Sequence, residues 1–269
     1  MFAQLINTLK KSPKTIVFTE GTDPRILEAS ARLLSGNFLK PVLVGNPDEI
    51  AAAAEDIGFN IRGAEIIDPE NYDGMDEMVD KMVELRKGKM TADECRAALK
   101  KSNYFGTMLV KMGKADALLG GATYSTADTV RPALQLIKTK PGAHLVSSCF
   151  ILVREKDGAE EKLAMGDCAI NIDYPDSKDK EGNVTLKGSQ KLAEVAIETA
   201  NTAKAFGIDP KVAVLSFSTK GSGKGGTVAL SREATEYAKE MNPDLAIDGE
   251  LQFDACLLYT SDAADDMQC

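Results

Sequence analysis

The stretch TIVFTEGTDPRILEASARLL, residues 15–34, decides the fold class. Its first five residues form a short, β-branched apolar run, which is typical of a strand buried on both faces. Asp23 and Pro24 follow a Glu-Gly turn, and these residue types are preferred at the N-cap and in the first turn of a helix. A strand that leads directly into a helix predicts a βαβ arrangement with a parallel sheet.

The alternation of strand and helix continues along the chain. Apolar runs predict further strands at 41–44, 61–68, 115–119, 143–153, within 162–172, at 211–217 and from 245. Amphipathic stretches and capping residues predict helices at 2–11, from 47, and at 74–87, 91–101, 103–112, 127–137, 187–206 and 228–241. Pro132 is expected in the first turn of its helix, where no N–H is needed. Hydrophilic composition predicts a hairpin loop at 154–161 and a solvated loop at 173–187.

A break in this pattern falls at Lys140, Pro141 and Gly142. We therefore expect an α/β protein with two open, doubly wound domains, 1–141 and 142–256, the second of them incomplete. In open α/β sheets, ligands bind beyond the carboxyl ends of the strands. The loops that follow the predicted strands are therefore the places to look for a site.

Composition excludes several classes of function. The chain has 269 residues, and 32 basic against 41 acidic side chains give a net charge of −9. This balance disfavours nucleic-acid binding, and no apolar run approaches the ~20 residues that span a membrane. The chain has five cysteines, no C-x-x-C pair and one histidine, which argues against disulfides and a metal site. Free thiols fit the reducing cytoplasm.

The loop at 120–131 carries groups that bind phosphate. Glycines let the backbone approach an anion, and N–H groups at a helix start can donate to it. The side chains that could hold phosphate oxygens are Ser125, Thr126, Thr129 and Arg131. The alternative is a capping loop with one surface arginine. For the polar cluster at 20–25 we favour a helix cap with surface charges.

The loop at 216–227 also joins a predicted strand to a helix. Residues 221–226 fit the G-x-G-x-x-G pattern, and Asp248 follows as the acidic residue of a dinucleotide site would. However, the first glycine comes several residues after the strand. Three interpretations stay open: a phosphate loop with Lys220 and Lys224, a dinucleotide site, or a flexible linker.

Five segments match the motifs of one enzyme family, in family order along 1–256. They are FTEGTDPR at 18–25, ELRKGK at 84–89, YFGTMLVKMGKADALLGGATYSTADTVRPALQLIKT at 104–139, SFSTKGS at 216–222 and DGELQFDA at 248–255. On these motifs the sequence resembles the phosphate acetyl/butyryltransferase family. The resemblance implies two α/β domains with an interdomain cleft that holds the active site, as in isocitrate and isopropylmalate dehydrogenases. It also implies the reaction acetyl-CoA + phosphate ⇌ acetyl phosphate + CoA, without a metal in the catalytic step.

The resemblance implies roles for individual residues. Arg131 and Arg86 are the expected catalytic residues, because the phosphate leaving group needs cations. The expected substrate-binding residues are Ser125, Thr126, Thr129, Ser216, Ser218, Thr219, Lys220 and Gly221. Cys168 is expected near the site but not essential. The implied partners are CoA and acetyl phosphate or phosphate, with no tightly bound cofactor and a homodimeric assembly. Acetyl and butyryl substrates are not distinguished, although the motifs look acetyl-type.

The sequence after Cys256, LLYTSDAADDMQC, continues no pattern. We expect a truncated chain with a foreign tail from residue 257, or alternatively a natural disordered terminus. The family's Ser-Arg motif and its base aspartate are not found, so little activity is expected of this chain alone. Two rival functions stay open: an NAD-dependent dehydrogenase and an inactive CoA-binding fragment.

Overall fold

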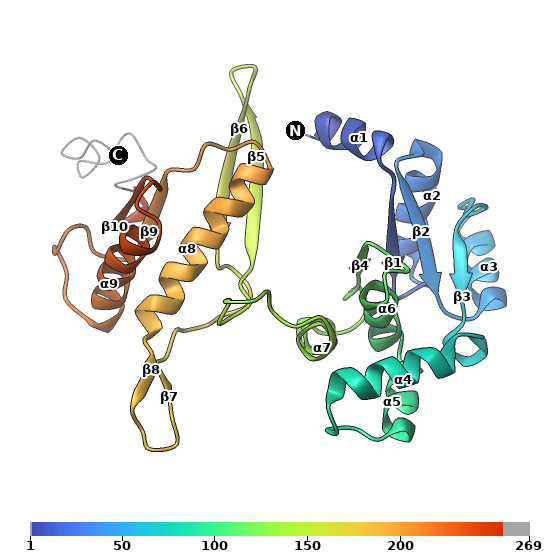
Figure 1. Cartoon of the computed structure of the whole chain (residues 1–269). Helices are drawn as coiled ribbons and strands as arrows, with labels where there is room; N and C mark the ends of the chain where they lie inside the picture. The colour runs from blue at the N-terminus through green and yellow to red at the C-terminus, as the bar shows by residue number, and fades with distance from the viewer. Residues whose placement is uncertain (1, 255–269) are drawn as a thin grey trace. The chain divides into compact units, whose positions relative to one another are not determined.

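The computed structural model describes residues 2–254, which form two compact units: an N-terminal unit, 2–138, and a C-terminal unit that starts at Thr139 (Figure 1). The domain limits 1–141 and 142–256 remain our proposal. The expected foreign tail lies outside the described residues. No helix within residues 2–254 combines the length and the hydropathy needed to cross a membrane.

The N-terminal unit is built on a four-stranded parallel sheet. Its strands are β1 (Lys14–Phe18), β2 (Leu39–Val44), β3 (Glu65–Ile67) and β4 (Ala117–Leu119). Their order in the sheet is β3-β2-β1-β4, so the chain proceeds outward from β1 in one direction and then returns to its other side. The boundary between β1 and β4 is therefore the topological switch point, where open α/β sheets bind ligands.

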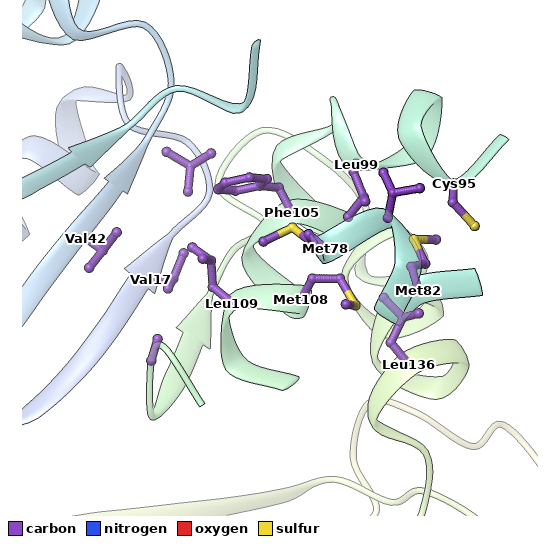
Figure 2. Packing of buried hydrophobic residues seen from close by; sticks show 13 residues of the cluster. Val17, Val42, Met78, Met82, Cys95, Leu99, Phe105, Met108, Leu109 and Leu136 are labelled. Atoms are coloured by element: carbon purple, nitrogen blue, oxygen red, sulfur yellow. The ribbon is translucent and has the colours of Figure 1, made fainter. Parts of the chain in front are cut away.

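Helices cover both faces of this sheet. They are α1 (Phe2–Lys11), α2 (Pro24–Gly36), α3 (Pro47–Asp56), α4 (Met75–Arg86), α5 (Ala92–Leu99), α6 (Ser102–Lys111) and α7 (Thr126–Pro132), with a 3₁₀ turn at Pro69–Asn71. Phe18 packs with α2 and α3, whereas Val17 joins the core formed with α4, α5 and α6 (Figure 2). Neighbours in a strand point to opposite faces, so β1 contributes to both cores. The predicted doubly wound α/β class is confirmed for this unit.

Capping residues set the starts of several helices. The Asp23 side chain accepts from the N–H of Arg25 at 2.9 Å at the start of α2, as predicted. Asn46 caps α3 in the same way, and Thr91 forms a reciprocal capping box with Glu94 at α5. These local signals explain why the predicted helices agree closely with the observed ones.

Two predictions in the N-terminal unit were wrong in detail. The strand expected at 61–68 is confined to β3, because the preceding residues form a turn around Gly63, whose φ is +102°. Pro132 is the last residue of α7 and not in its first turn. The chain then continues as one π-helical turn, Ala133–Ile137, a form often found where the regular helical hydrogen bonds are interrupted.

The C-terminal unit combines a parallel strand pair with two antiparallel hairpins. Its elements are β5 (Cys149–Lys156), β6 (Ala159–Gly166), β7 (Ser177–Lys178), β8 (Val184–Leu186), α8 (Gly188–Ala205), β9 (Val212–Leu215), α9 (Gly226–Met241) and β10 (Ile247–Leu251). β9 and β10 are parallel. Alanines at 193, 200, 234 and 238 are buried in the core that α8 and α9 form with this strand pair. Their small side chains allow the helices to approach closely.

The hairpins correct three sequence-based expectations. The predicted strand at 143–153 begins only at Cys149. The hairpin predicted at 154–161 is confirmed, but its loop is confined to Asp157 and Gly158, whose φ values of +53° and +76° form a tight turn. The loop expected at 173–187 contains the small β7–β8 hairpin. An Asp-Gly pair favours a two-residue hairpin turn, so the short loop could have been predicted from the sequence.

Candidate functional site

The switch point of the N-terminal sheet brings together two loops that are far apart in sequence. Glu20 follows β1, and Gly121, Ala122 and Thr123 follow β4. One carboxylate oxygen of Glu20 accepts from the N–H groups of Gly121 and Ala122, each at 2.9 Å. The other accepts from the Thr123 hydroxyl at 2.7 Å and from the Thr123 N–H. The cluster at 20–25 is therefore more than the expected helix cap.

The Glu20 carboxylate is held in its charged form. Partial burial opposes ionisation, but the hydrogen bonds from Thr123, Ala122 and Gly121 outweigh it and lower the pKa of Glu20. Arg25 holds the same loop from the other side, because it donates to the Ala122 carbonyl at 2.7 Å. The loop after β4 is thus fixed through both its N–H and its C=O groups.

A short contact between two hydroxyl groups joins the residue after β1 to the loop after β4. Thr19 is 2% exposed, and its hydroxyl lies 2.5 Å from the Tyr124 hydroxyl. Burial raises the pKa of Tyr124, so the phenol stays protonated. A Cβ on Gly120 would lie 2.0 Å from the Tyr124 hydroxyl oxygen, so this glycine is required by close approach.

The predicted phosphate-binding side chains lie on the short helix that follows. Ser125 caps α7, and its hydroxyl donates to Asp128 at 2.7 Å. Thr126 is exposed and Thr129 is half-buried near Tyr124. Arg131 is exposed, and none of the ion pairs or hydrogen bonds within residues 2–254 uses its guanidinium. Among the described residues Arg131 is thus a free cation on the same short helix as Thr126 and Thr129.

The second expected arginine, Arg86, is the last residue of α4. It is half-buried, and its Nε is buried without a hydrogen-bond partner. Burial raises the pKa of Cys95, and the charge of Arg86 partly offsets that effect. Arg86 therefore lies beside α5 and not in the segment that carries Arg131.

The loop from Ser216 to Gly225 is organised by a buried carboxylate in the C-terminal unit. Glu250 of β10 is 1% exposed and forms two hydrogen bonds with Arg232, both at 3.0 Å. It also accepts from the Gly221 N–H at 2.7 Å and the Ser218 hydroxyl at 3.3 Å. The bond to Arg232 contributes most to lowering the pKa of Glu250 to about 2, so the carboxylate is ionised at neutral pH.

The hydroxyls of this loop mostly bind the loop itself. Ser218 is fully buried, and its hydroxyl oxygen accepts from the Gly223 N–H at 2.8 Å. Thr219 donates to the Gln252 side chain at 3.2 Å, and Ser216 accepts from the Ser218 N–H at 3.3 Å. The loop is therefore an ordered structure and not the flexible linker considered from sequence.

A pocket of about 480 Å³ lies beside this loop, lined by Lys220, Gly221, Arg232, Thr235, Glu236, Lys239, Asp248, Gly249 and Glu250. Asp248 accepts from Lys220 at 2.6 Å and from Lys239 at 3.3 Å. A dinucleotide-binding protein needs the equivalent carboxylate for the ribose hydroxyl. Since Asp248 is already paired with two lysines, this geometry does not favour the dinucleotide interpretation.

Cys168 lies just beyond β6 and is exposed. Its neighbour Asp167 accepts from the N–H and hydroxyl of Ser148 and from the Asn171 side chain. Burial works against ionisation, but these bonds lower the pKa of Asp167 to about 2. The turn that carries Cys168 is thereby tied to the segment before β5. Within residues 2–254 no group of three His, Cys, Asp or Glu side chains is placed to hold a metal ion.

A family model described as "Phosphate acetyl/butaryl transferase" matches residues 1–264. The chain belongs to the phosphate acetyl/butaryl transferase family. The phosphate acetyltransferase of Bacillus subtilis is 50% identical over 243 residues, which cover 90% of this chain and 70% of the relative. The phosphate acetyltransferase of Staphylococcus aureus strain MRSA252 is 42% identical over 265 residues, covering 95% of this chain and 75% of the relative.

Solved structures give the same result. A phosphotransacetylase from Streptococcus pyogenes superposes with a TM-score of 0.82 at 47% identity, covering 94% of this chain and 73% of that one. The EutD phosphotransacetylase from Staphylococcus aureus gives 0.80 at 41% identity, with coverage of 98% and 77%. The predicted α/β fold class and the predicted transferase family are confirmed.

In this member of the phosphate acetyl/butaryl transferase family, most of the predicted site residues fall into two groups, whereas Arg86 at the end of α4 and Cys168 beyond β6 belong to neither. Ser125, Thr126, Thr129 and Arg131 share one segment of the N-terminal unit, and the residues at 216–221 share one loop of the C-terminal unit. Sequence reasoning missed the two glutamates that hold these loops, Glu20 and Glu250. A charged residue within a strand that is otherwise mostly apolar was a usable signal for Glu250.

Proposed function

We propose that this chain is a phosphate acetyltransferase, which transfers an acetyl group reversibly between CoA and inorganic phosphate. The observation that carries the proposal is the 50% identity with the phosphate acetyltransferase of Bacillus subtilis across 90% of the chain. Arg131 is exposed, has no side-chain partner within residues 2–254 and shares a short helix with Thr126 and Thr129, which fits an enzyme that must bind a doubly charged phosphate. None of the relatives and solved structures named above is a dehydrogenase by name.

The chemistry assigns a role to each group of residues. When the CoA thiolate attacks the carbonyl of acetyl phosphate, negative charge develops on the carbonyl oxygen and on the departing phosphate. Arg131 is proposed to bind the phosphate with two parallel hydrogen bonds, and Arg86 to supply further positive charge. Ser125, Thr126 and Thr129 are proposed to hold phosphate oxygens.

The loop at 216–221 is proposed to bind CoA. Ser216, Ser218, Thr219, Lys220 and Gly221 contribute to it, and Lys220 would offer positive charge to the CoA phosphates. Cys168 is proposed to lie near the substrates without reacting. CoA and acetyl phosphate act as substrates, so no tightly bound cofactor or metal is needed. We also propose a cytoplasmic homodimer, which sedimentation of the purified chain would test.

The test is to mix the purified 269-residue chain with CoA and acetyl phosphate and to follow thioester absorbance. Acetyl-CoA formation above the protein-free rate supports the proposal. The absence of acetyl-CoA formation contradicts it. CoA binding without turnover, measured by calorimetry, would favour the CoA-binding alternative.

A further inference from the structure

Glu20 binds three consecutive main-chain donors of the loop after β4, at the switch point. Its carboxylate accepts from the N–H groups of Gly121, Ala122 and Thr123 and from the Thr123 hydroxyl. Gly121 has a φ of +100°, which turns successive N–H groups toward one point and creates an anion-binding concavity. In this structure the anion in that concavity belongs to the protein.

We propose that Glu20 is a positioning residue for the phosphate-binding segment at 125–131, and that substrate phosphate binds the side chains of this segment and not the N–H groups of the loop. This inference rests on the proposed function. The loop connects Glu20 to this segment, because Tyr124 and Ser125 follow Thr123 directly. Holding Gly121, Ala122 and Thr123 in place therefore fixes the position at which the segment 125–131 starts.

The contacts around the loop favour positioning over capping. Asp23, not Glu20, caps α2, so Glu20 is not needed for that helix. The peptide of Ala122 is held twice, since its N–H donates to Glu20 at 2.9 Å and its carbonyl accepts from Arg25 at 2.7 Å. Tyr124, which follows Thr123, is held by the 2.5 Å contact between its hydroxyl and that of Thr19. Without these bonds the loop would be free to move.

A competing interpretation makes Glu20 a gate that substrate phosphate displaces from the N–H groups. The two interpretations predict opposite effects of removing the carboxylate. If Glu20 is a gate, Glu20→Ala empties the concavity, and inorganic phosphate should bind more tightly. If Glu20 positions the loop, the same change loosens residues 121–123, and phosphate should bind more weakly.

Glu20→Gln provides a second, nearly isosteric test. Both carboxylate oxygens accept from main-chain N–H groups, so either orientation of the Gln amide places its NH₂ against an N–H donor. The substitution therefore disrupts the loop without changing its volume. Glu55→Gln is the matched control, because Glu55 is an exposed carboxylate on α3 in the same unit.

The experiment measures initial rates with acetyl-CoA and phosphate for the full chain and these three variants. We expect both Glu20 variants to raise the KM for phosphate at least ~10-fold, equivalent to about 1.4 kcal/mol, with the KM for acetyl-CoA changed less than ~2-fold. The control should match the unmodified chain. An unchanged or lower KM for phosphate in Glu20→Ala would overturn the proposal.

Amide hydrogen exchange provides a readout that does not depend on activity. In both Glu20 variants the amides of residues 121–123 should exchange at least ~10-fold faster, while those of α2 keep their protection. Unchanged protection of residues 121–123 would overturn the positioning role. If the unmodified chain forms no acetyl-CoA, the proposed function fails, and exchange together with calorimetry on inorganic phosphate still decides the role of Glu20.

Discussion

The side-chain amide of Asn103 donates a hydrogen bond of 2.8 Å to the main-chain carbonyl of Asp128. In a regular α-helix this carbonyl would accept from the N–H four residues later, but residue 132 is a proline and has no N–H. Asn103, on α6, therefore supplies the donor that α7 lacks. This bond supports the end of the helix that carries Arg131.

We expect Asn103→Ala to lower the free energy of unfolding by about 1–2 kcal/mol, because the Asp128 carbonyl loses this donor. Pro132→Ala restores a main-chain N–H at the right place. The Asn103 change should therefore cost less in the Pro132→Ala background. Urea unfolding of the unmodified chain, both single variants and the double variant gives the coupling energy.

Asn103→Asp is the control for this cycle. Asn103 also accepts from the Tyr104 N–H at 2.9 Å, and an aspartate keeps that acceptor. Its carboxylate oxygen would face the Asp128 carbonyl, so this change should be at least as destabilising as Ala. Equal costs of Asn103→Ala in the two backgrounds would show that Pro132 and Asn103 are not coupled.

Most of the fold could be predicted because its causes are local. The apolar run at 15–19 is long enough for β1, and Asp23 caps α2 through a bond from the N–H of Arg25, two residues later. Pro132 marks the limit of such reasoning. Local rules place a proline in the first turn of a helix, whereas its position at the end of α7 is accommodated by Asn103 on a different helix.

The candidate site was predicted only in part for the same reason. The hydroxyls, the glycines and Arg131 stand together in the sequence, and their chemistry is visible there. Glu20 and Glu250 act on loops that are distant in sequence, and only the parallel strand order brings each glutamate to its loop. The sequence therefore indicated candidate loops but not what holds them in place.

Arg131→Ala should lower kcat/KM for acetyl phosphate at least ~100-fold, because the proposed phosphate site loses its bidentate cation. Arg131→Lys should recover only part of the rate, since an ammonium cannot present a planar pair of donors. Steady-state kinetics with acetyl phosphate and CoA measures both effects.

Arg62→Ala is the matched control for Arg131. Arg62 is an exposed arginine in the same unit, and no hydrogen bond or ion pair within residues 2–254 uses its guanidinium. Its removal should leave kcat/KM within ~2-fold and stability within about 0.5 kcal/mol. Near-normal kcat/KM in Arg131→Ala would remove Arg131 from the proposed mechanism.

Cys168 should be the first of the described cysteines to react with iodoacetamide. It is exposed, whereas Cys95 is fully buried and burial raises the pKa of both Cys95 and Cys149. Mass spectrometry of partly alkylated protein measures the order. Cys168→Ala should keep kcat within ~3-fold if the thiol does not react, while a larger loss would give this thiol a catalytic role.

Glu250 should make the stability of the chain depend on pH at the acidic end. Its pKa in the folded chain is about 2 against an ordinary value of 4.5, so its contribution to stability is fully present above pH 4.5 and is lost as the pH falls toward 2.

Glu250→Gln removes the charge that pairs with Arg232 and should lower the free energy of unfolding by about 2 kcal/mol at pH 7. Because protonated glutamate resembles glutamine, the difference from the unmodified chain should shrink below pH 4.5 and vanish near pH 2. Urea midpoints across this range, with the exposed Glu240→Gln as control, measure it. A difference that stays constant from pH 7 to pH 2 would show that the Glu250 charge does not stabilise the loop.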